Sequence, residues 1–392
     1  MKICLVSIHP RLLSGQINSL VGLGRGLRDR GHQVQLVTAF AETRLLDPDR
    51  IYGPEASAGI LPAKLLRIAR IVRRLQDAAK DADVVQLNLP TPSFSVVGDV
   101  VQALLHRPIV VGFEAQLPLA TDLLGRRMLA APQFYCPQLL INNRLVARVS
   151  SFRASRYVVA SALQAAELGS LGVSPERVSV IPNLIDAERL QEHLNPDVAN
   201  LPTGGPIISY IGHFNHVKGV DVLVRAMPDV LKEYPRAQLV LAWSGLGPRR
   251  PVQRAVEESG VAEHVHVVGR VPVSGLIRQS DVVALPYRLT IGQAAFPGLV
   301  LEAMATGVPL VTSDLPLLRE LVEPGQEAEL AQPEDPGDVA RSIVRLLDDP
   351  TRREAMVQAQ RRLMRYSFDP DRLVQKYEAV YDTGVAAHSG CR

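Results

Sequence analysis

The chain has 392 residues, of which 47% are apolar and 21% are charged, and its formal net charge is +3. This length allows two or more domains, and this composition is typical of a folded globular protein and excludes a disordered one. No apolar run approaches the ~18 residues of a membrane span, and the first residues read as a strand rather than as a signal peptide. We therefore expect a cytoplasmic protein.

The charge and the cysteines exclude further classes. Residues 1–200 hold 22 Lys and Arg against 17 Asp and Glu, which would favour an anionic partner or a membrane surface. No aromatic–basic motif accompanies this charge, so nucleic-acid binding is not predicted. Cys4, Cys136 and Cys391 are too scattered for a disulfide framework or a zinc site.

The first half of the chain alternates short apolar runs with segments of helical period. Such runs are typical of strands that are buried on both faces of a sheet. Between the first two runs, the segment 17–31 predicts a helix that ends at Gly31. The predicted strands are residues 2–8, 32–39, 83–89, 108–113, 156–161 and 178–182.

A polar break at 194–206 separates this half from a second set of alternating runs. Its strands are expected at 207–213, 237–243, 265–269, 281–287 and 308–313. Alternation of this kind predicts parallel sheets with crossover helices. The fold class is therefore α/β, with two doubly wound domains, 1–195 and 205–367, facing each other across a cleft. A last helix at about 368–385 is expected to pack back on the first domain.

Ligands of open parallel sheets bind at the carboxyl ends of the strands, which makes those turns the candidate sites. Ser14 and Gly15 come before the first helix, so its free N–H groups suit a phosphate, although on its own this segment favours an ordinary tight turn. In "YIGHFNHVKG", Gly212 allows close backbone approach while His213 and Lys218 offer positive charge to an anion. The alternative is a surface loop with a solvated lysine.

Three later strand ends add weaker signals. "WSGLGPRR" (243–250) is interpreted as a tight turn, and the backbone at 267–272 suits the edge of a flat heterocycle. In "FPGLVLEAMATG", Pro297 and Gly298 suit the first helical positions and Gly307 ends the helix. Glu302 then lies one turn in, where it either accepts two hydrogen bonds from ribose hydroxyls or is a solvated or capping glutamate.

Together these turns resemble the retaining nucleotide-sugar glycosyltransferases of family 4, which have the GT-B fold of two Rossmann-like domains. The resemblance runs from "MKICLVSIHP" to "FDPDRLVQKYEAVYD", and its most specific parts are "YIGHFNHVKG", "WSGLGPRR", "VSVIPNLID" and "FPGLVLEAMATGVPLVTSDLPLLRELV". It implies a UDP- or GDP-sugar as donor, no further cofactor and no metal. No Asp-x-Asp stands at a predicted strand end.

The resemblance also implies a role for each matching position. Lys218 would grip the donor diphosphate, with His213 standing where an arginine is usual, and Glu302 would bind the ribose. The resemblance further implies that Gly15 contacts the donor phosphate and that the backbone of Arg270 and Val271 binds the base. It also implies that the donor sugar and phosphate are bound by Pro297, Gly298 and Leu299. Transfer would retain the anomeric configuration by a same-face route, in which the departing phosphate takes the acceptor proton.

Two positions depart from the family pattern. Ala294 stands where a second glutamate usually touches the donor sugar, and Glu114 stands where a histidine is usual. Glu114 either hydrogen-bonds the sugar or the acceptor, or is a buried structural acid. These departures keep two other functions open: a GT-B protein that binds nucleotide or sugar without turnover, and a sugar-nucleotide epimerase or hydrolase.

The acceptor is not identified by the sequence. The segment 63–80 has an apolar face opposite a basic one, which suits an anionic membrane and a lipid-linked acceptor, or a helix that packs on the sheet with a solvated basic face. The segment 128–143 is either an acceptor-side loop or a packed connection. Peripheral contact with the inner membrane face is thus compatible with the sequence.

Overall fold

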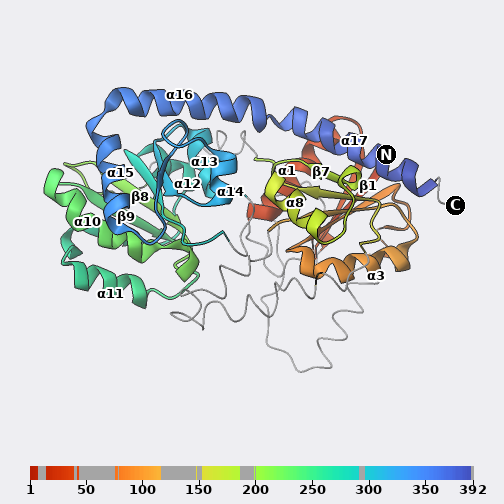
Figure 1. Cartoon of the computed structure of the whole chain (residues 1–392), viewed down its shortest axis with the longest axis horizontal. Helices are drawn as coiled ribbons and strands as arrows, with labels where there is room; N and C mark the ends of the chain where they lie inside the picture. The colour runs from red at the N-terminus through yellow and green to blue at the C-terminus, as the bar shows by residue number, and fades with distance from the viewer. Residues whose placement is uncertain are drawn as a thin grey trace. The chain divides into compact units, whose positions relative to one another are not determined.

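The computed structural model describes residues 1–7, 15–38, 42–43, 76–77, 79–115, 147, 152–185, 198, 200–290 and 296–389. Residues 63–75, the segment 128–143, Ser14 and Ala294 lie outside these ranges. The chain divides into two compact units (Figure 1). Unit 1 consists of Met1–Ile185, Ile291–Ala295 and Phe368–Arg392, and unit 2 of Asp186–Thr290 and Phe296–Ser367.

Unit 1 contains a sheet of order β3-β2-β1-β4-β5-β6-β7. Its strands are β1 Lys2–Ser7, β2 Gln33–Thr38, β3 Glu42–Thr43, β4 Val84–Leu89, β5 Ile109–Phe113, β6 Arg156–Val159 and β7 Val178–Val180. Neighbouring strands are parallel except β2 and β3. The strands that the sequence predicts are therefore parallel, and β3 is an additional edge strand that runs antiparallel because its connection to β2 is too short for a crossover.

Two apolar layers cover the sheet of unit 1. Alternate residues of β1 point to opposite faces, so Ile3 and Leu5 pack in one core while Cys4 and Val6 pack in the other. The first core includes residues of α1 and α17, and burial on both faces explains the uninterrupted apolar strands. The helices among the described residues of this unit are α1 Gly15–Asp29, η2 Pro92–Phe94, α3 Ser95–Leu105, α8 Ala162–Ser170, η3 Pro175–Arg177 and α17 Pro370–Ser389.

Unit 2 contains a wholly parallel sheet of order β10-β9-β8-β11-β12-β13. Its strands are β8 Ile207–Gly212, β9 Gln238–Trp243, β10 Val265–Val268, β11 Val282–Leu285, β12 Leu310–Ser313 and β13 Glu329–Ala331. The strand order reverses between β8 and β11, as in doubly wound sheets. The prediction of two Rossmann-like α/β domains is confirmed.

The helices of unit 2 connect successive strands of this sheet. For example, α10 follows β8 and α11 follows β9, and the two helices pack together (Figure 1). Within the part of unit 2 that the structure describes, the helices are η4 His216–Lys218, α10 Val220–Glu233, α11 Arg250–Ser259, η5 Ala262–His264, α12 Val273–Arg278, α13 Gly298–Thr306, α14 Pro316–Leu321, α15 Pro336–Asp348 and α16 Pro350–Ser367.

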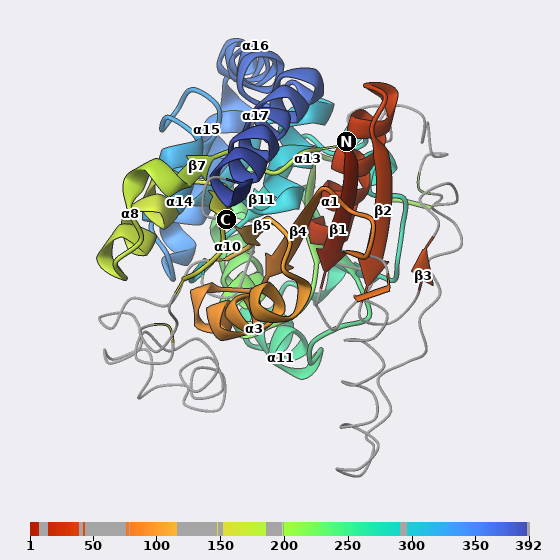
Figure 2. The ribbon, with the colours of Figure 1, turned by 90° about the vertical axis from the view of Figure 1, so that its right-hand side faces the viewer.

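Helix α17 packs closely on unit 1, beside α1 (Figure 2). The Tyr381 hydroxyl donates a hydrogen bond to the Gln86 side chain in β4, and both residues are buried. A Cβ atom at Gly26 of α1 would lie 2.5 Å from a methyl carbon of Val374. Glycine at position 26 therefore permits the close approach of the two helices.

We predict that Gly26→Ala destabilises unit 1 by about 1–3 kcal/mol, because the new methyl group overlaps a buried, β-branched neighbour. Gly22→Ala is the matched control in the same helix, since its Cβ would meet its nearest neighbour, Leu184, at 3.9 Å. That variant should gain ~1 kcal/mol of helix propensity. Thermal unfolding measures both, and Gly26→Ala/Val374→Ala should recover part of the loss. Equal melting temperatures for the two alanine variants would contradict the packing argument.

Candidate functional site

The candidate site lies at the point of unit 2 where the strand order reverses. Ligands of doubly wound sheets bind there, outside the carboxyl ends of the strands on either side. Residues 213–219, here called the Lys218 loop, follow β8, and Pro286–Arg288 follow β11. Since β8 and β11 are neighbours in the sheet, these two segments leave it side by side.

The Lys218 loop has a backbone that requires glycine at its end. Gly219 has a φ of +67°, and a Cβ atom there would lie 1.9 Å from the Pro286 carbonyl oxygen. The loop closes with a hydrogen bond of 3.0 Å from the Lys218 backbone N–H to the Asn215 carbonyl. This turn places Lys218 at the end of η4, directly before α10.

Lys218 is half-buried against an aromatic ring. Its Nζ lies 4.6 Å from the centroid of the Tyr287 ring, a cation–π distance. Burial lowers the pKa of Lys218 from its ordinary 10.5 to about 8. The ammonium is therefore still mostly protonated at pH 7, but it is held in a less polar environment where an incoming anion would be attracted strongly.

Glu302 approaches the same ring from α13. That helix begins at Gly298 and ends at Thr306, with Gly307 at φ +76° as its C-cap. Pro297 precedes the helix as its N-cap, one position earlier than a first helical residue. Burial raises the pKa of Tyr287, and the nearby Glu302 carboxylate raises it further. The structure thus places the Lys218 ammonium against the Tyr287 ring and the Glu302 carboxylate within electrostatic range of the same residue.

The ends of β8, β9 and β10 are joined through Ser244. Its hydroxyl pairs with His213 Nδ1, and its carbonyl accepts a 3.0 Å hydrogen bond from Arg270 Nε. Its backbone N–H donates to the Gly212 carbonyl at 3.0 Å. Gly212, His213 and Arg270 are therefore connected at one edge, with Val271 half-buried beside Arg270.

Two predicted residues belong to unit 1. Gly15 is the first residue of α1. Glu114 follows β5 directly and is 6% exposed, and its carboxylate oxygens have no hydrogen-bond partner in the part of the chain that the structure describes. Burial raises the pKa of Glu114 to about 8, so the carboxyl group is largely protonated at pH 7.

Sequence reasoning missed Tyr287, Arg288 and Ser244. Tyr287 is the last residue of the predicted strand 281–287 and looked like part of it, and Arg288 follows that strand directly. A usable signal was an arginine immediately after a run as apolar as "DVVALPY", because a buried arginine is almost always paired. Ser244 carried no signal of its own within "WSGLGPRR".

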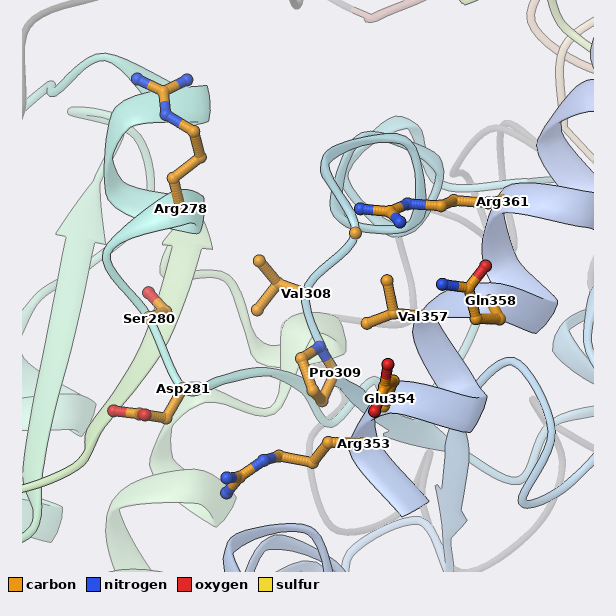
Figure 3. A pocket seen from close by; sticks show the side chains of 11 residues that line it. Arg278, Ser280, Asp281, Val308, Pro309, Arg353, Glu354, Val357, Gln358 and Arg361 are labelled. Carbon is orange, nitrogen blue, oxygen red and sulfur yellow. The ribbon is translucent and has the colours of Figure 1, made fainter. Parts of the chain in front are cut away.

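A polar groove of about 470 Å³ lies at the opposite edge of the same sheet (Figure 3). Its lining includes Asp281, directly before β11, and Pro309, directly before β12. Arg278, Arg353 and Arg361 surround it. The groove contains none of the predicted site residues, so it is separate from the candidate site.

Two further searches of the described ranges gave no site. No group of three or more His, Cys, Asp or Glu side chains among these residues is placed to hold a metal ion. None of the described helices has the length and apolar character needed to cross a membrane.

Two protein-family models match the chain. Residues 13–189 match the family described as Glycosyltransferase Family 4, and residues 205–349 match the one described as Glycosyl transferases group 1. Together the two matches cover most of both units.

Known proteins resemble the chain at low identity. The phosphatidyl-myo-inositol mannosyltransferase of Mycobacterium leprae is 29% identical over 52% of this chain, which spans only 54% of that relative. The protein of the same name from Mycolicibacterium smegmatis is 25% identical, covering 98% of this chain and 95% of its own length.

Solved structures show the same fold over nearly the whole chain. Sucrose-phosphate synthase of Thermosynechococcus elongatus superposes with a TM-score of 0.75 at 21% identity, covering 99% of this chain and 100% of its own. Anabaena Alr3699/HepE in complex with UDP-glucose gives 0.72 at 20% identity, covering 98% and 100%.

We predict that Lys218→Met stabilises the protein at pH 7. A lysine whose pKa falls from 10.5 to about 8 on folding opposes folding below pH 8, because the unfolded chain binds its proton more tightly. After loss of the cation–π contact the net gain should be about 1–2 kcal/mol. Thermal unfolding at pH 7 and pH 9.5 should show the gain shrinking between pH 8 and 10.5. A variant less stable than wild type at pH 7 would disprove the burial argument.

Proposed function

Because this chain belongs to the group 1 glycosyltransferases of family 4, we propose that it transfers a sugar from a nucleoside-diphosphate sugar to an acceptor hydroxyl with retention of configuration. One observation supports this most: at the reversal point of the unit 2 sheet, the Lys218 ammonium lies 4.6 Å from the Tyr287 ring centroid, and the Glu302 carboxylate is near enough to Tyr287 to raise its pKa. The Lys218 ammonium can bind the diphosphate of a nucleoside diphosphate, and the Glu302 carboxylate can bind its ribose hydroxyls.

In this proposal the donor lies along the carboxyl edge of unit 2. Lys218 and the first N–H groups of α13, at Gly298 and Leu299, bind the diphosphate, where the helix dipole favours negative charge. Glu302 accepts two hydrogen bonds from the ribose hydroxyls. The backbone of Arg270 and Val271 binds the base. The donor is a UDP- or GDP-sugar, and the UDP-glucose complex of Alr3699/HepE supports the first.

The proposed reaction needs no group beyond the donor and the acceptor. The bond between the anomeric carbon and the phosphate oxygen breaks while the acceptor oxygen bonds to the same face of that carbon. The acceptor proton moves to the departing phosphate. Lys218, His213 and the α13 N–H groups stabilise the charge that develops on the phosphate, which is worth ~3 kcal/mol for one preorganised donor.

Unit 1 supplies the remaining residues of the proposal. Gly15 at the start of α1 contacts phosphate, and Glu114 hydrogen-bonds the transferred sugar or the acceptor. Since the carboxyl group of Glu114 is buried and largely protonated at pH 7, it can donate a hydrogen bond there as well as accept one. The names of the mannosyltransferase relatives contain a phosphatidyl lipid, which supports a lipid-linked acceptor and peripheral contact with a membrane surface. The proposal places the protein on the cytoplasmic side of that membrane.

The fold alone does not decide the reaction. A UDP-N-acetylglucosamine 2-epimerase structure from Listeria monocytogenes shares it, with a TM-score of 0.64 at 16% identity. Incubation with UDP- and GDP-sugars in acceptor-free buffer separates the cases. An epimerase or hydrolase converts its donor there, whereas the proposed transferase leaves the sugar of its donor unchanged.

We predict that Glu302→Ala and Lys218→Ala each weaken binding of UDP or GDP at least tenfold, about 1.4 kcal/mol, because each removes one end of the donor site. Isothermal titration calorimetry measures the dissociation constants. Glu257→Ala is the matched control, since Glu257 is exposed on α11. Affinity that is unchanged in both site variants would remove Lys218 and Glu302 from the donor site.

A further inference from the structure

Three consecutive residues after β11 hold the Lys218 loop in place. Pro286, Tyr287 and Arg288, here called the clasp, each contact it at a different point. The Pro286 carbonyl oxygen fills the space beside Gly219, and the Tyr287 ring lies against the Lys218 ammonium. Arg288 then binds the loop by its backbone and by its side chain.

Arg288 donates hydrogen bonds to two successive carbonyl groups of the short helix η4. Its backbone N–H donates to the Val217 carbonyl at 2.9 Å, and Nη1 donates to the His216 carbonyl at 2.9 Å. The same guanidinium makes a two-pronged pair with Asp221 in the first turn of α10, at 2.7 and 2.8 Å. The loop that carries Lys218 is thus fixed from before the lysine to just after it.

The positive charge of this arrangement, on Arg288, is almost fully removed from water. The Arg288 side chain is 7% exposed, and its Nε also pairs with Glu334 at 3.1 Å. Glu334 has a φ of +64°, a strained conformation for a residue other than glycine. Burial alone would raise the pKa of Asp221, but hydrogen bonds and charge from Arg288 and then Arg225 lower it to about 2.

A buried ion pair of this kind contributes little to stability compared with apolar residues of the same volume. Its contribution here is geometric, because only a forked, planar guanidinium reaches the His216 carbonyl and both Asp221 oxygens at once. We propose that Arg288 is a positioning residue, which holds η4 so that the Lys218 ammonium stays over Tyr287, ready for the donor diphosphate. This inference rests on the proposed function of Lys218.

Asp221 provides a matched control for the test. It also binds Arg225, which is more exposed, at 2.6 Å and four residues along α10. Both arginines therefore neutralise Asp221, but Arg288 is the one that also donates to η4. Arg225→Ala removes a positive charge that pairs with the Asp221 carboxylate, and it leaves Pro286, Tyr287 and Arg288 unchanged.

The experiment compares Arg225→Ala, Arg288→Lys and Arg288→Met/Asp221→Leu by calorimetry with UDP and GDP and by thermal unfolding. The double variant replaces the ion pair with apolar side chains, so its melting temperature should stay close to that of wild type. We expect Arg225→Ala to bind within about twofold of wild type. Arg288→Lys and the double variant should bind at least tenfold more weakly, about 1.4 kcal/mol.

If Arg288→Met/Asp221→Leu folds and binds UDP or GDP with wild-type affinity, the proposal is overturned. If that variant does not fold, wild-type affinity in Arg288→Lys overturns the proposal instead. If Lys218→Ala weakens nucleotide binding while the Arg288 variants do not, the positioning role of Arg288 is refuted and the proposed donor site is retained. If wild type binds neither nucleotide, the donor site fails. In that case a crystal structure of Arg288→Lys tests the positioning role of Arg288. A Lys218 Nζ that still lies 4.6 Å from the Tyr287 ring centroid would refute this role, and a displaced Lys218 side chain would support it.

Discussion

The contact between the Lys218 ammonium and the Tyr287 ring is the interaction on which this account depends. It keeps a positive charge at a half-buried position, where burial lowers the lysine pKa to about 8. When no anion is bound, burial of the Lys218 ammonium opposes folding. When an anion is bound, the same low polarity strengthens the attraction between the anion and the ammonium. Such a local conflict between stability and charge is typical of a functional site rather than of a structural one.

Lys218 and Glu114 both have pKa values that are shifted by burial, whereas the pKa values of the surface ion pairs are shifted by their charged partners. Burial lowers the pKa of the lysine and raises that of the glutamate, in each case towards the neutral form. Asp314 is the contrast, because the pKa of that carboxylate is lowered by a direct hydrogen bond from Arg319, a partner that is largely exposed. Groups shifted by burial are candidates for ligand contact, whereas paired groups near the surface are usually structural.

The central strands of both sheets were predictable because they are buried on both faces, which leaves uninterrupted apolar runs in the sequence. The two strands that were missed, β3 and β13, are edge strands of two and three residues, and each begins with a glutamate. The helix containing Glu302 was predictable from Pro297 and Gly307, since both residues mark helix ends by their backbone geometry.

The site was predictable only where a single segment contains its own signal. Lys218 lies in a loop between Gly212 and Gly219, and Glu302 lies in a helix between Pro297 and Gly307, so the local sequence indicates both residues. Arg288 acts on Asp221 across 67 residues, and Ser244 joins His213 to Arg270 across 31 and 26 residues. Such contacts arise from the order of strands in the sheet, which no local pattern encodes.

The most direct test of the donor site is a crystal structure of the chain with UDP or GDP bound. The account predicts a phosphate oxygen within hydrogen-bond distance of Lys218 Nζ and of the first α13 N–H groups, with ribose hydroxyls on Glu302. A nucleotide bound instead in the arginine-lined groove at the amino edge of the unit 2 sheet would contradict it.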